Sequence, residues 1–306
     1  MRTVAAGGIA VMPNAHDSSE QRTIRLTEAP SLLRTLARGT VTARGRSGTS
    51  LPAVTYELTT GIPRERLSDY QRLCGFPVGD ALPPTYPHVL GFPLQAHLMA
   101  DRAFPLPLPG LVHVSNTITV HRVLSASEEL TVRVRAERLR NHPKGRVVDL
   151  VTCADVQGER VWDGVSKYLH RGSGDPDADP GDLGPRLPDG PPVAQWRLGA
   201  DLGRRYAGVS GDVNPIHLSA PSARAMGFPR AIAHGMWTYA ATLAALGRRA
   251  SVPSTSHVWF RKPVLIPGRV ELCVDSSGPV VVAGLRSAPD HAVEQLVLNL
   301  QPATEN

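Results

Sequence analysis

The 306-residue chain contains 42% hydrophobic and 20% charged residues and has a formal net charge of +6. These proportions are typical of a soluble globular protein, and no apolar run reaches the roughly 18–20 residues that a membrane-spanning helix needs. The 33 Lys and Arg residues are dispersed along the chain, so they do not form the basic stripe that is typical of nucleic-acid binding. We therefore expect neither a nucleic acid nor a membrane as a partner.

The cysteines and the N-terminus bear on the compartment. Cys74, Cys153 and Cys273 are far apart and form no CxxC pair, which predicts a reducing, cytoplasmic compartment and argues against a structural zinc site. The first residues contain only a weak apolar stretch without a cleavage pattern. We expect a poorly ordered tail over residues 1–20 rather than a signal peptide.

The elements follow in chain order. Alternating and apolar patterns predict helices over 27–38, with Thr27 as N-cap, and over 94–103, 219–226 and 235–248. Strands are predicted over 130–137, 147–156, 161–169, 257–261, 270–274, 279–285 and 293–300. One helix followed by several antiparallel strands, twice over, predicts an α+β fold in which a sheet wraps an apolar helix.

A segment rich in Gly, Pro and Asp divides the chain. Of the 22 residues from 171 to 192, 16 are of these three types, so the segment offers little apolar surface to bury. We interpret it as a linker between an N-terminal half, 21–170, and a C-terminal half, 193–306.

The two halves share landmarks at one offset of 136 residues. A Tyr followed five residues later by Gly occurs at 70–75 and at 206–211, and Gly-Phe-Pro occurs at 91–93 and at 227–229. Two matches in register predict an internal duplication.

Chemically distinctive residues cluster in the second half. Asp212, Asn214 and His217 lie within six residues of one another around Pro215. Proline forces the preceding residue out of the α region and sets a turn, so the loop can direct the carboxylate and the imidazole into one cleft. The structural alternative is a tight turn whose Asp and Asn bond their own backbone.

A second signal follows at His234-Gly235, before the apolar helix predicted over 235–248. The N-terminus of a helix presents unpaired N–H groups and the positive end of the dipole, and Gly allows a substrate to approach the backbone closely. The alternative is that His234 only caps or packs against the helix.

Comparison of the two halves favours a functional role for these polar residues over a purely structural one. At the common offset, the positions of Asp212, Asn214, His217 and His234 are occupied in the first half by apolar residues: Phe76, Val78, Ala81 and Leu98. If the polar residues were required by the fold of the repeat, the first half would need them as well.

The sequence Ser-Gly-Asp-Val-Asn-Pro-Ile-His at 210–217, followed by Ile-Ala-His-Gly-Met at 232–236, resembles the hydratase motif of the MaoC-like family of (R)-specific enoyl-thioester hydratases and (3R)-hydroxyacyl-thioester dehydratases. The resemblance is strong over 206–240 and extends weakly over 50–302. It implies a double hot dog, in which two antiparallel sheets each wrap a central helix within one pseudo-dimeric chain.

The resemblance also implies a mechanism and site residues. Asp212 and His217 would hold the water that adds to a trans-2-enoyl thioester, and the Gly235 N–H would polarise the thioester carbonyl. Asn214 would orient the pair or the water without itself transferring protons. Around them, substrate-binding positions are expected at Ser210, Pro215, His234 and Met236. No metal or redox cofactor is required, the substrate is an acyl-CoA or acyl-carrier-protein thioester, and a homodimer of double hot-dog chains is compatible with this reading.

Two other functions stay open at this stage. Hot-dog folds include thioesterases, although the intact Asp-Asn-His block argues against that activity. A non-catalytic acyl-thioester-binding or partner subunit could also retain the block. In addition, Gly91 and its neighbours suggest a helix in the first half that is opened to admit a long acyl chain.

Overall fold

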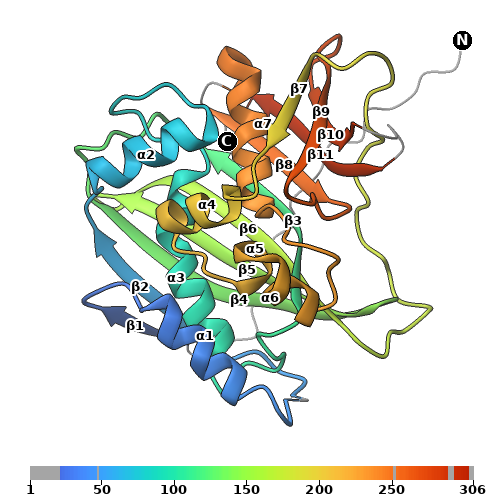
Figure 1. Cartoon of the computed structure of the whole chain (residues 1–306). Helices are drawn as coiled ribbons and strands as arrows, with labels where there is room; N and C mark the ends of the chain where they lie inside the picture. Colours follow the sequence, from blue (N-terminus) through green and yellow to red (C-terminus); the bar gives the residue numbers. More distant parts are fainter. Residues whose placement is uncertain (1–20, 47, 251–252, 289–292, 303–306) are drawn as a thin grey trace, which may run out of the picture.

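The computed structural model describes residues 21–46, 48–250, 253–288 and 293–302 (Figure 1). The tail predicted over 1–20 lies outside the described residues. Within the described part of the chain, no helix combines the length and the apolar character that crossing a membrane requires.

The strands form one sheet in the order β1-β2-β4-β5-β6-β3-β8-β11-β10-β9-β7. The pairings of neighbouring strands are antiparallel except for the parallel pair β1 and β2. The first half supplies β1 (Arg22–Leu26), β2 (Val54–Thr60), β3 (Leu111–Val120), β4 (Leu130–His142), β5 (Gly145–Val156) and β6 (Glu159–Arg171). The second half supplies β7 (Ala194–Leu198), β8 (Ser254–Phe260), β9 (Gly268–Asp275), β10 (Val281–Ser287) and β11 (Glu294–Pro302).

The strand order is symmetric about the pair formed by β3 and β8. Reading outward, the first half gives β3-β6-β5-β4-β2 and the second half gives β8-β11-β10-β9-β7. The two central strands pair from Ser115 opposite Trp259 to Val120 opposite Ser254. The two predicted sheets are therefore joined edge to edge into one.

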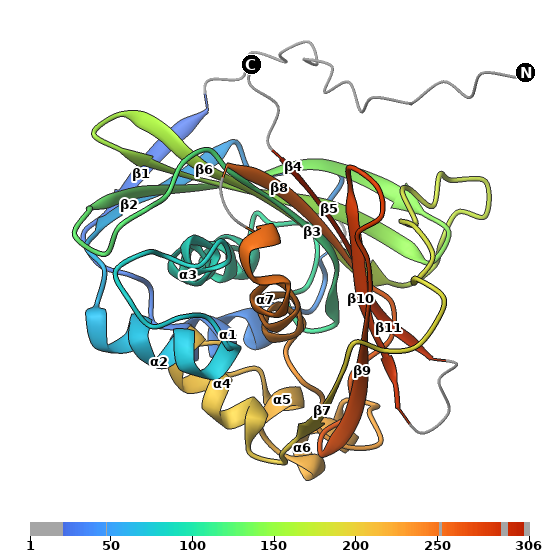
Figure 2. The same ribbon diagram turned by 90° about the horizontal axis from the view of Figure 1, so that it is seen from above.

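Two apolar helices, α3 (Tyr86–Ala100) and α7 (Gly235–Leu246), lie side by side inside the curve of this sheet (Figure 2). Figure 2 shows the shorter helices across the open side: α1 (Leu32–Val41), α2 (Arg64–Cys74), α4 (Leu202–Ser210), α5 (Pro215–Leu218) and α6 (Ala220–Ala225). This arrangement of two wrapped helices in one chain confirms the α+β double hot-dog fold.

The Tyr and Gly landmark of the predicted duplication is confirmed. α2 ends at Gly75 and α4 ends at Gly211, both left-handed, with φ of 86° and 80°. Tyr70 and Tyr206 are buried on these helices with ring centroids 6.1 Å apart. The matching residues therefore meet near the axis that relates the halves.

The prediction that the two Gly-Phe-Pro segments correspond is wrong. Residues 91–93 lie inside α3, whereas residues 227–229 lie in the loop between α6 and α7. The structural equivalence is given by a backbone bond before each central helix: Leu82 N–H donates to Leu124, and Ala233 N–H donates to Val264. These two donors are 151 residues apart (233 − 82).

The change of offset from 136 to 151 means that the second half contains 15 additional residues before its central helix. That insertion contains α5 and α6. The pairings of His217 with Ala81 and of His234 with Leu98 were therefore wrong. If Leu82 is aligned with Ala233, the donors of the two bonds, Pro83 corresponds to His234. The first half has no segment that corresponds to the one containing His217.

Two predicted helices begin elsewhere, and a third is preceded by a short helix that was not predicted separately. The helix predicted over 27–38 is α1, which begins after Ser31, because Pro30 keeps the preceding backbone extended. The helix predicted over 94–103 is α3, which begins eight residues earlier and continues through Gly91 and Pro93. Residues 219–226 form α6 behind the N-cap Ser219, but a separate α5 precedes it.

The helix α3 is continuous, so the hypothesis that the first-half helix is opened to admit a long acyl chain is wrong. It has 15 residues against 12 in α7, and most of its side chains are buried. At Gly91 a Cβ would lie 2.8 Å from Cγ2 of Thr152. The glycine therefore allows close packing of helix against sheet rather than a break.

The predicted strands and the α7 helix are confirmed, with most strand ends shifted by a few residues and α7 ending at Leu246. Between β6 and β7 the chain forms no helix or strand, and Trp259 and Arg261 donate hydrogen bonds to the carbonyls of Asp182 and Leu183. The segment therefore lies against β8. The division of the chain at 171–192 stays a prediction.

Candidate active site

Three side chains from different elements converge beside the N-terminus of α7. Asp212 follows the end of α4, His217 lies on α5, and His234 is the N-cap of α7. Their ligand atoms lie within 4.8 Å of one another, and among the described residues they form the one group that meets this criterion for a metal ion. A carboxylate and two imidazoles are donors that a divalent ion could use.

The backbone of the Asp212 loop is held by its own side chains. Ser210 Oγ accepts from the N–H of Asp212 at 3.1 Å, and Asp212 Oδ1 accepts from the N–H of Asn214 at 3.1 Å. Asn214 Oδ1 in turn accepts from Ile216 N–H at 3.4 Å as the N-cap of α5. The tight turn considered from the sequence is therefore present, and it places Asp212 and His217 together.

Two backbone carbonyls set the proton positions on the imidazoles. His217 Nδ1 donates to the carbonyl of Ile232 at 2.8 Å, and His234 Nε2 donates to the carbonyl of Asp212 at 2.9 Å. The two rings stack with centroids 3.7 Å apart. Because a carbonyl only accepts, the neutral form of His217 has an unprotonated Nε2.

Burial shifts the pKa values of the acid and the base in opposite directions. Burial raises the pKa of Asp212, and the nearby His217 and the N–H of Asn214 oppose that rise. Burial lowers the pKa of His217 against the opposite influence of Asp212, and it lowers the pKa of His234 well below its usual value. The pKa values of Asp212 and His217 are therefore drawn toward each other, which favours proton exchange with a water between them.

Solvent reaches the group from the side of the carboxylate. The Asp212 side chain is 24% exposed, whereas His217 and His234 are buried. Within the part of the chain that the structure describes, His234 Nδ1 is buried without a hydrogen-bond partner.

The first turn of α7 presents backbone donors beside this group. Trp237 and Thr238 donate their N–H groups to the His234 carbonyl at 3.1 Å, whereas the N–H of Gly235 has no intrahelical acceptor at this end of the helix. A Cβ at Gly235 would lie 3.1 Å from Cε1 of Phe260. Glycine thus avoids a tight contact with the Phe260 ring at the helix start and leaves its own N–H accessible.

The other predicted substrate-binding residues have structural contacts. Ser210 is buried and donates its hydroxyl to the Tyr206 carbonyl, Pro215 is exposed at the start of α5, and Met236 is buried in the core. Their part in substrate binding stays a prediction.

Three aromatic residues near the site were not predicted as site residues from the sequence: Tyr206, Phe260 and His113. Tyr206 places its ring 4.8 Å from that of His234, and Phe260 lies against Gly235. Phe260 in turn contacts His113 of the first half, with ring centroids 5.0 Å apart. The repeat of Tyr206 as Tyr70 was a usable signal, whereas no local pattern marks the other two residues.

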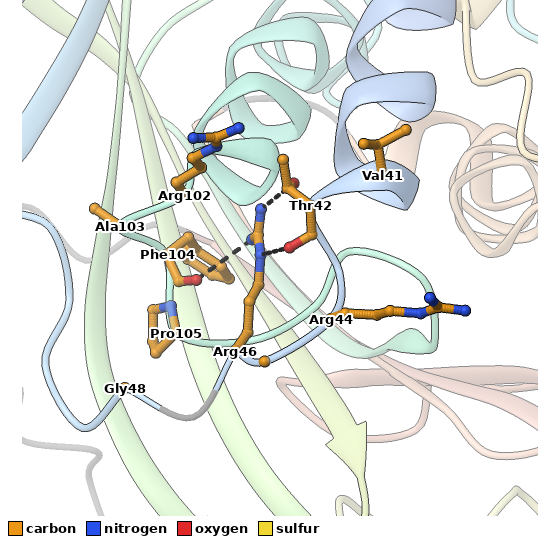
Figure 3. A pocket seen from close by; sticks show the side chains of 10 residues that line it. Val41, Thr42, Arg44, Arg46, Gly48, Arg102, Ala103, Phe104 and Pro105 are labelled. Carbon is orange, nitrogen blue, oxygen red and sulfur yellow. Dashed lines mark hydrogen bonds between the residues drawn. The ribbon is translucent and has the colours of Figure 1, made fainter.

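A pocket of about 430 Å³ lies elsewhere, near the C-terminal end of α3, with Arg44, Arg46 and Arg102 in its lining (Figure 3). Figure 3 shows Arg46 directed toward Thr42 and Phe104. The Arg46 guanidinium donates to carbonyls that include those of Met99 and Ala100, so it satisfies the end of the helix. We interpret this arginine as structural.

Two family models match the chain. The MaoC like domain matches residues 193–287, and the FAS1-like dehydratase domain region matches residues 68–163. The first contains Asp212, His217 and His234.

Known proteins that resemble the chain are dehydratases as well. The chain is 41% identical over 209 residues to 3-hydroxyacyl-thioester dehydratase X of Mycobacterium tuberculosis, covering 67% of this chain and 74% of that protein. It is 39% identical over 74 residues to 3-hydroxybutyryl-CoA dehydratase of Methylorubrum extorquens, covering 23% of this chain and 47% of that protein. The crystal structure of HtdX of Mycobacterium tuberculosis superposes with a TM-score of 0.70 at 33% identity, over 80% of this chain and 99% of that one. The chain therefore belongs to the family of MaoC-like dehydratases.

Proposed function

We propose that the protein interconverts trans-2-enoyl thioesters and (3R)-3-hydroxyacyl thioesters in fatty-acid or related acyl metabolism, with the reacting water held between Asp212 and His217. The observation that carries the proposal is the convergence of the carboxylate and the imidazoles within 4.8 Å beside a helix N-terminus. One water with two hydrogen bonds of about 2.8 Å can bridge such a separation. The dehydratase names of the relatives support the same reaction.

In the hydration direction, the Gly235 N–H donates to the thioester oxygen, which draws electrons from the C2–C3 double bond. The unprotonated Nε2 of His217 accepts a proton as the water oxygen bonds to C3, and the Asp212 carboxylate stabilises the resulting imidazolium. C2 then takes up a proton from the pair, which returns both groups to their starting forms. Dehydration follows the same steps in reverse.

The backbone donor and the acid–base pair contribute separately. A single donor to a developing oxyanion is typically worth about 2.7–4 kcal/mol, and a positioned acid or base about 10²–10⁴-fold in rate. The positive end of the α7 dipole adds to the first contribution. Asn214 acts through the backbone of α5, where it holds the helix that positions His217.

The alternatives differ in product. A thioesterase would release free thiol from the same substrate, and a non-catalytic acyl-thioester-binding subunit would bind the substrate without turnover. The test is to incubate the protein with short and long trans-2-enoyl-CoA while following both the enoyl-thioester absorbance and free thiol. We expect absorbance to fall without thiol release; thiol release, or binding without turnover, would contradict the proposal.

The proposal includes the carrier and the setting of the reaction. The acyl carrier is coenzyme A or a carrier protein. A cytoplasmic location is supported by the three free, buried cysteines, Cys74, Cys153 and Cys273, because disulfides are rare in reducing compartments. A homodimer of double hot-dog chains is also part of the proposal, and sedimentation of the purified protein tests it.

A further inference from the structure

The first half presents polar side chains on the inner surface of the sheet, where the packing around α3 would otherwise be apolar. Gln95, Asn116, Thr152 and Ser166 are each at most 1% exposed. We call these residues together with His113 and Tyr168 the polar cluster. Buried polar groups are costly unless they are hydrogen-bonded, so a cluster of this size requires an explanation.

The polar cluster begins at the active site. Phe260 separates Gly235 from His113: a Cβ at Gly235 would lie 3.1 Å from the Phe260 ring, and the Phe260 and His113 centroids are 5.0 Å apart. The His113 ring stacks on that of Tyr168 at 4.6 Å. The polar cluster therefore lies on the first-half side of the α7 N-terminus, with the Phe260 ring between them.

An irregularity in β3 creates part of the polar cluster. The pairing register with β6 shifts between His113 and Ser115, so residues three apart lie on the same face. Asn116 Nδ2 lies 3.4 Å from His113 Nε2 and donates to Ser166 Oγ at 2.8 Å.

Gln95 of α3 connects the remaining members. Its Nε2 donates to Thr152 Oγ1 at 2.9 Å, and its Oε1 accepts from the Tyr168 hydroxyl at 3.3 Å. The polar groups are thus held in fixed directions rather than left to rearrange.

The network is incomplete at one acceptor. Asn116 Oδ1 is buried and has no hydrogen-bond partner among the described residues. An unsatisfied buried acceptor is destabilising, and a hydroxyl group brought by a ligand would supply the missing donor.

We propose that the polar cluster selects enoyl thioesters whose acyl chain has a hydroxyl group beyond the double bond, and that this hydroxyl donates to Asn116 Oδ1. The inference rests on the proposed function and names the substrate class of the same site. Sites built to hydrogen-bond a substrate hydroxyl discriminate strongly against the analogue that lacks it, because the protein group is then left unpaired.

The test compares trans-2-octenoyl-CoA with its hydroxylated derivatives, a set of isomers that each have one hydroxyl at a successive carbon beyond C4. For wild type, we expect kcat/KM to be at least about tenfold higher for one of the hydroxylated isomers than for octenoyl-CoA. In Asn116→Leu the order should reverse, since leucine has the same number and branching of side-chain heavy atoms as asparagine but accepts no hydrogen bond. Ser166→Ala, which removes the bond that orients Asn116, should reduce the preference in the same direction and serves if the leucine variant does not fold.

Asn299→Leu is the matched control. Asn299 Oδ1 is also buried and finds no partner in the described ranges, but Asn299 alternates along β11 with Leu298 and Leu300, which are buried in the core. Its substitution should leave the selectivity unchanged. Hydration of octenoyl-CoA with no preference for any hydroxylated isomer would overturn this inference alone, whereas no hydration of any substrate would overturn the proposed function and the inference with it.

Discussion

At the scale of single residues, the site depends on which groups hold protons. Burial raises the pKa of Asp212 and lowers that of His217, and the carbonyl of Ile232 fixes the proton of the neutral imidazole on Nδ1. The proposed hydration needs an ionised carboxylate and a neutral imidazole. The chemistry therefore depends on two groups that are both deprotonated.

The first prediction concerns pH. Because a raised pKa means that Asp212 takes up a proton at higher pH than an ordinary aspartate, kcat/KM for hydration should decline on the acid side and stay level above neutral pH. In Asp212→Asn the residual activity should keep its level to lower pH, since the carboxylate no longer raises the pKa of His217. The kcat/KM profile measured from about pH 5 to pH 9 checks this. A decline through pH 7 to 8 would instead indicate an essential imidazolium.

The second prediction concerns Asn214. As the N-cap of α5 it holds the helix of His217, so Asn214→Ala should lower kcat and destabilise the protein by about 0.5–2 kcal/mol. Asn214→Ser retains the capping oxygen and should retain most of both. Chemical denaturation and steady-state kinetics measure the two effects. Equal loss of kcat in both variants, with no loss of stability in either, would assign Asn214 a direct role toward the water.

At the scale of elements, the start of α7 must combine access with packing. Gly235 leaves its N–H without an intrahelical partner and has Phe260 at the distance of a tight contact. Replacement by a larger residue therefore requires a shift of either the helix start, which contains the donor, or the Phe260 ring.

The third prediction tests this packing. Gly235→Ala should lower kcat/KM, because the added methyl displaces either the helix start or Phe260. The double variant Gly235→Ala with Phe260→Leu should recover part of the loss, since the smaller side chain relieves the contact. Kinetics of the three variants on one enoyl-CoA check this. No recovery in the double variant would mean that the methyl obstructs the substrate itself.

Prediction from the sequence succeeded where the signal was local. Asp212, His217 and His234 lie in one short block, and their convergence follows from a turn, a short helix and a helix start. His113, Tyr168 and Phe260 were not predicted, because they reach the site through strand pairing and a register shift far away in the chain. The comparison of the halves was partly wrong because Gly-Phe-Pro occurs in two unrelated settings, inside α3 and in a loop.

At the scale of the whole molecule, the halves are one structural unit. β3 and β8 join them through a run of six paired residues, and the ring of Tyr70 meets that of Tyr206. The half that lacks the Asp-Asn-His block still supplies the strand beside the site. We therefore expect catalysis to require both halves.

The fourth prediction follows from this dependence. Residues 193–306 expressed alone should be inactive and prone to association, because β8 loses its partner and becomes an exposed sheet edge. Co-expression with residues 1–192 should restore hydration. Activity of the isolated second half would show that the first half is not needed for the reaction.

The most direct test of the central claim is the rate of enoyl-thioester absorbance loss for wild type and Asp212→Asn, with circular dichroism to verify that both are folded. The substitution keeps the size of the side chain and the capping of the turn but removes the ionisable group. If Asp212 acts with His217 on the water, kcat/KM should fall by about 10²–10⁴-fold in the variant. Equal rates for the two proteins would contradict it.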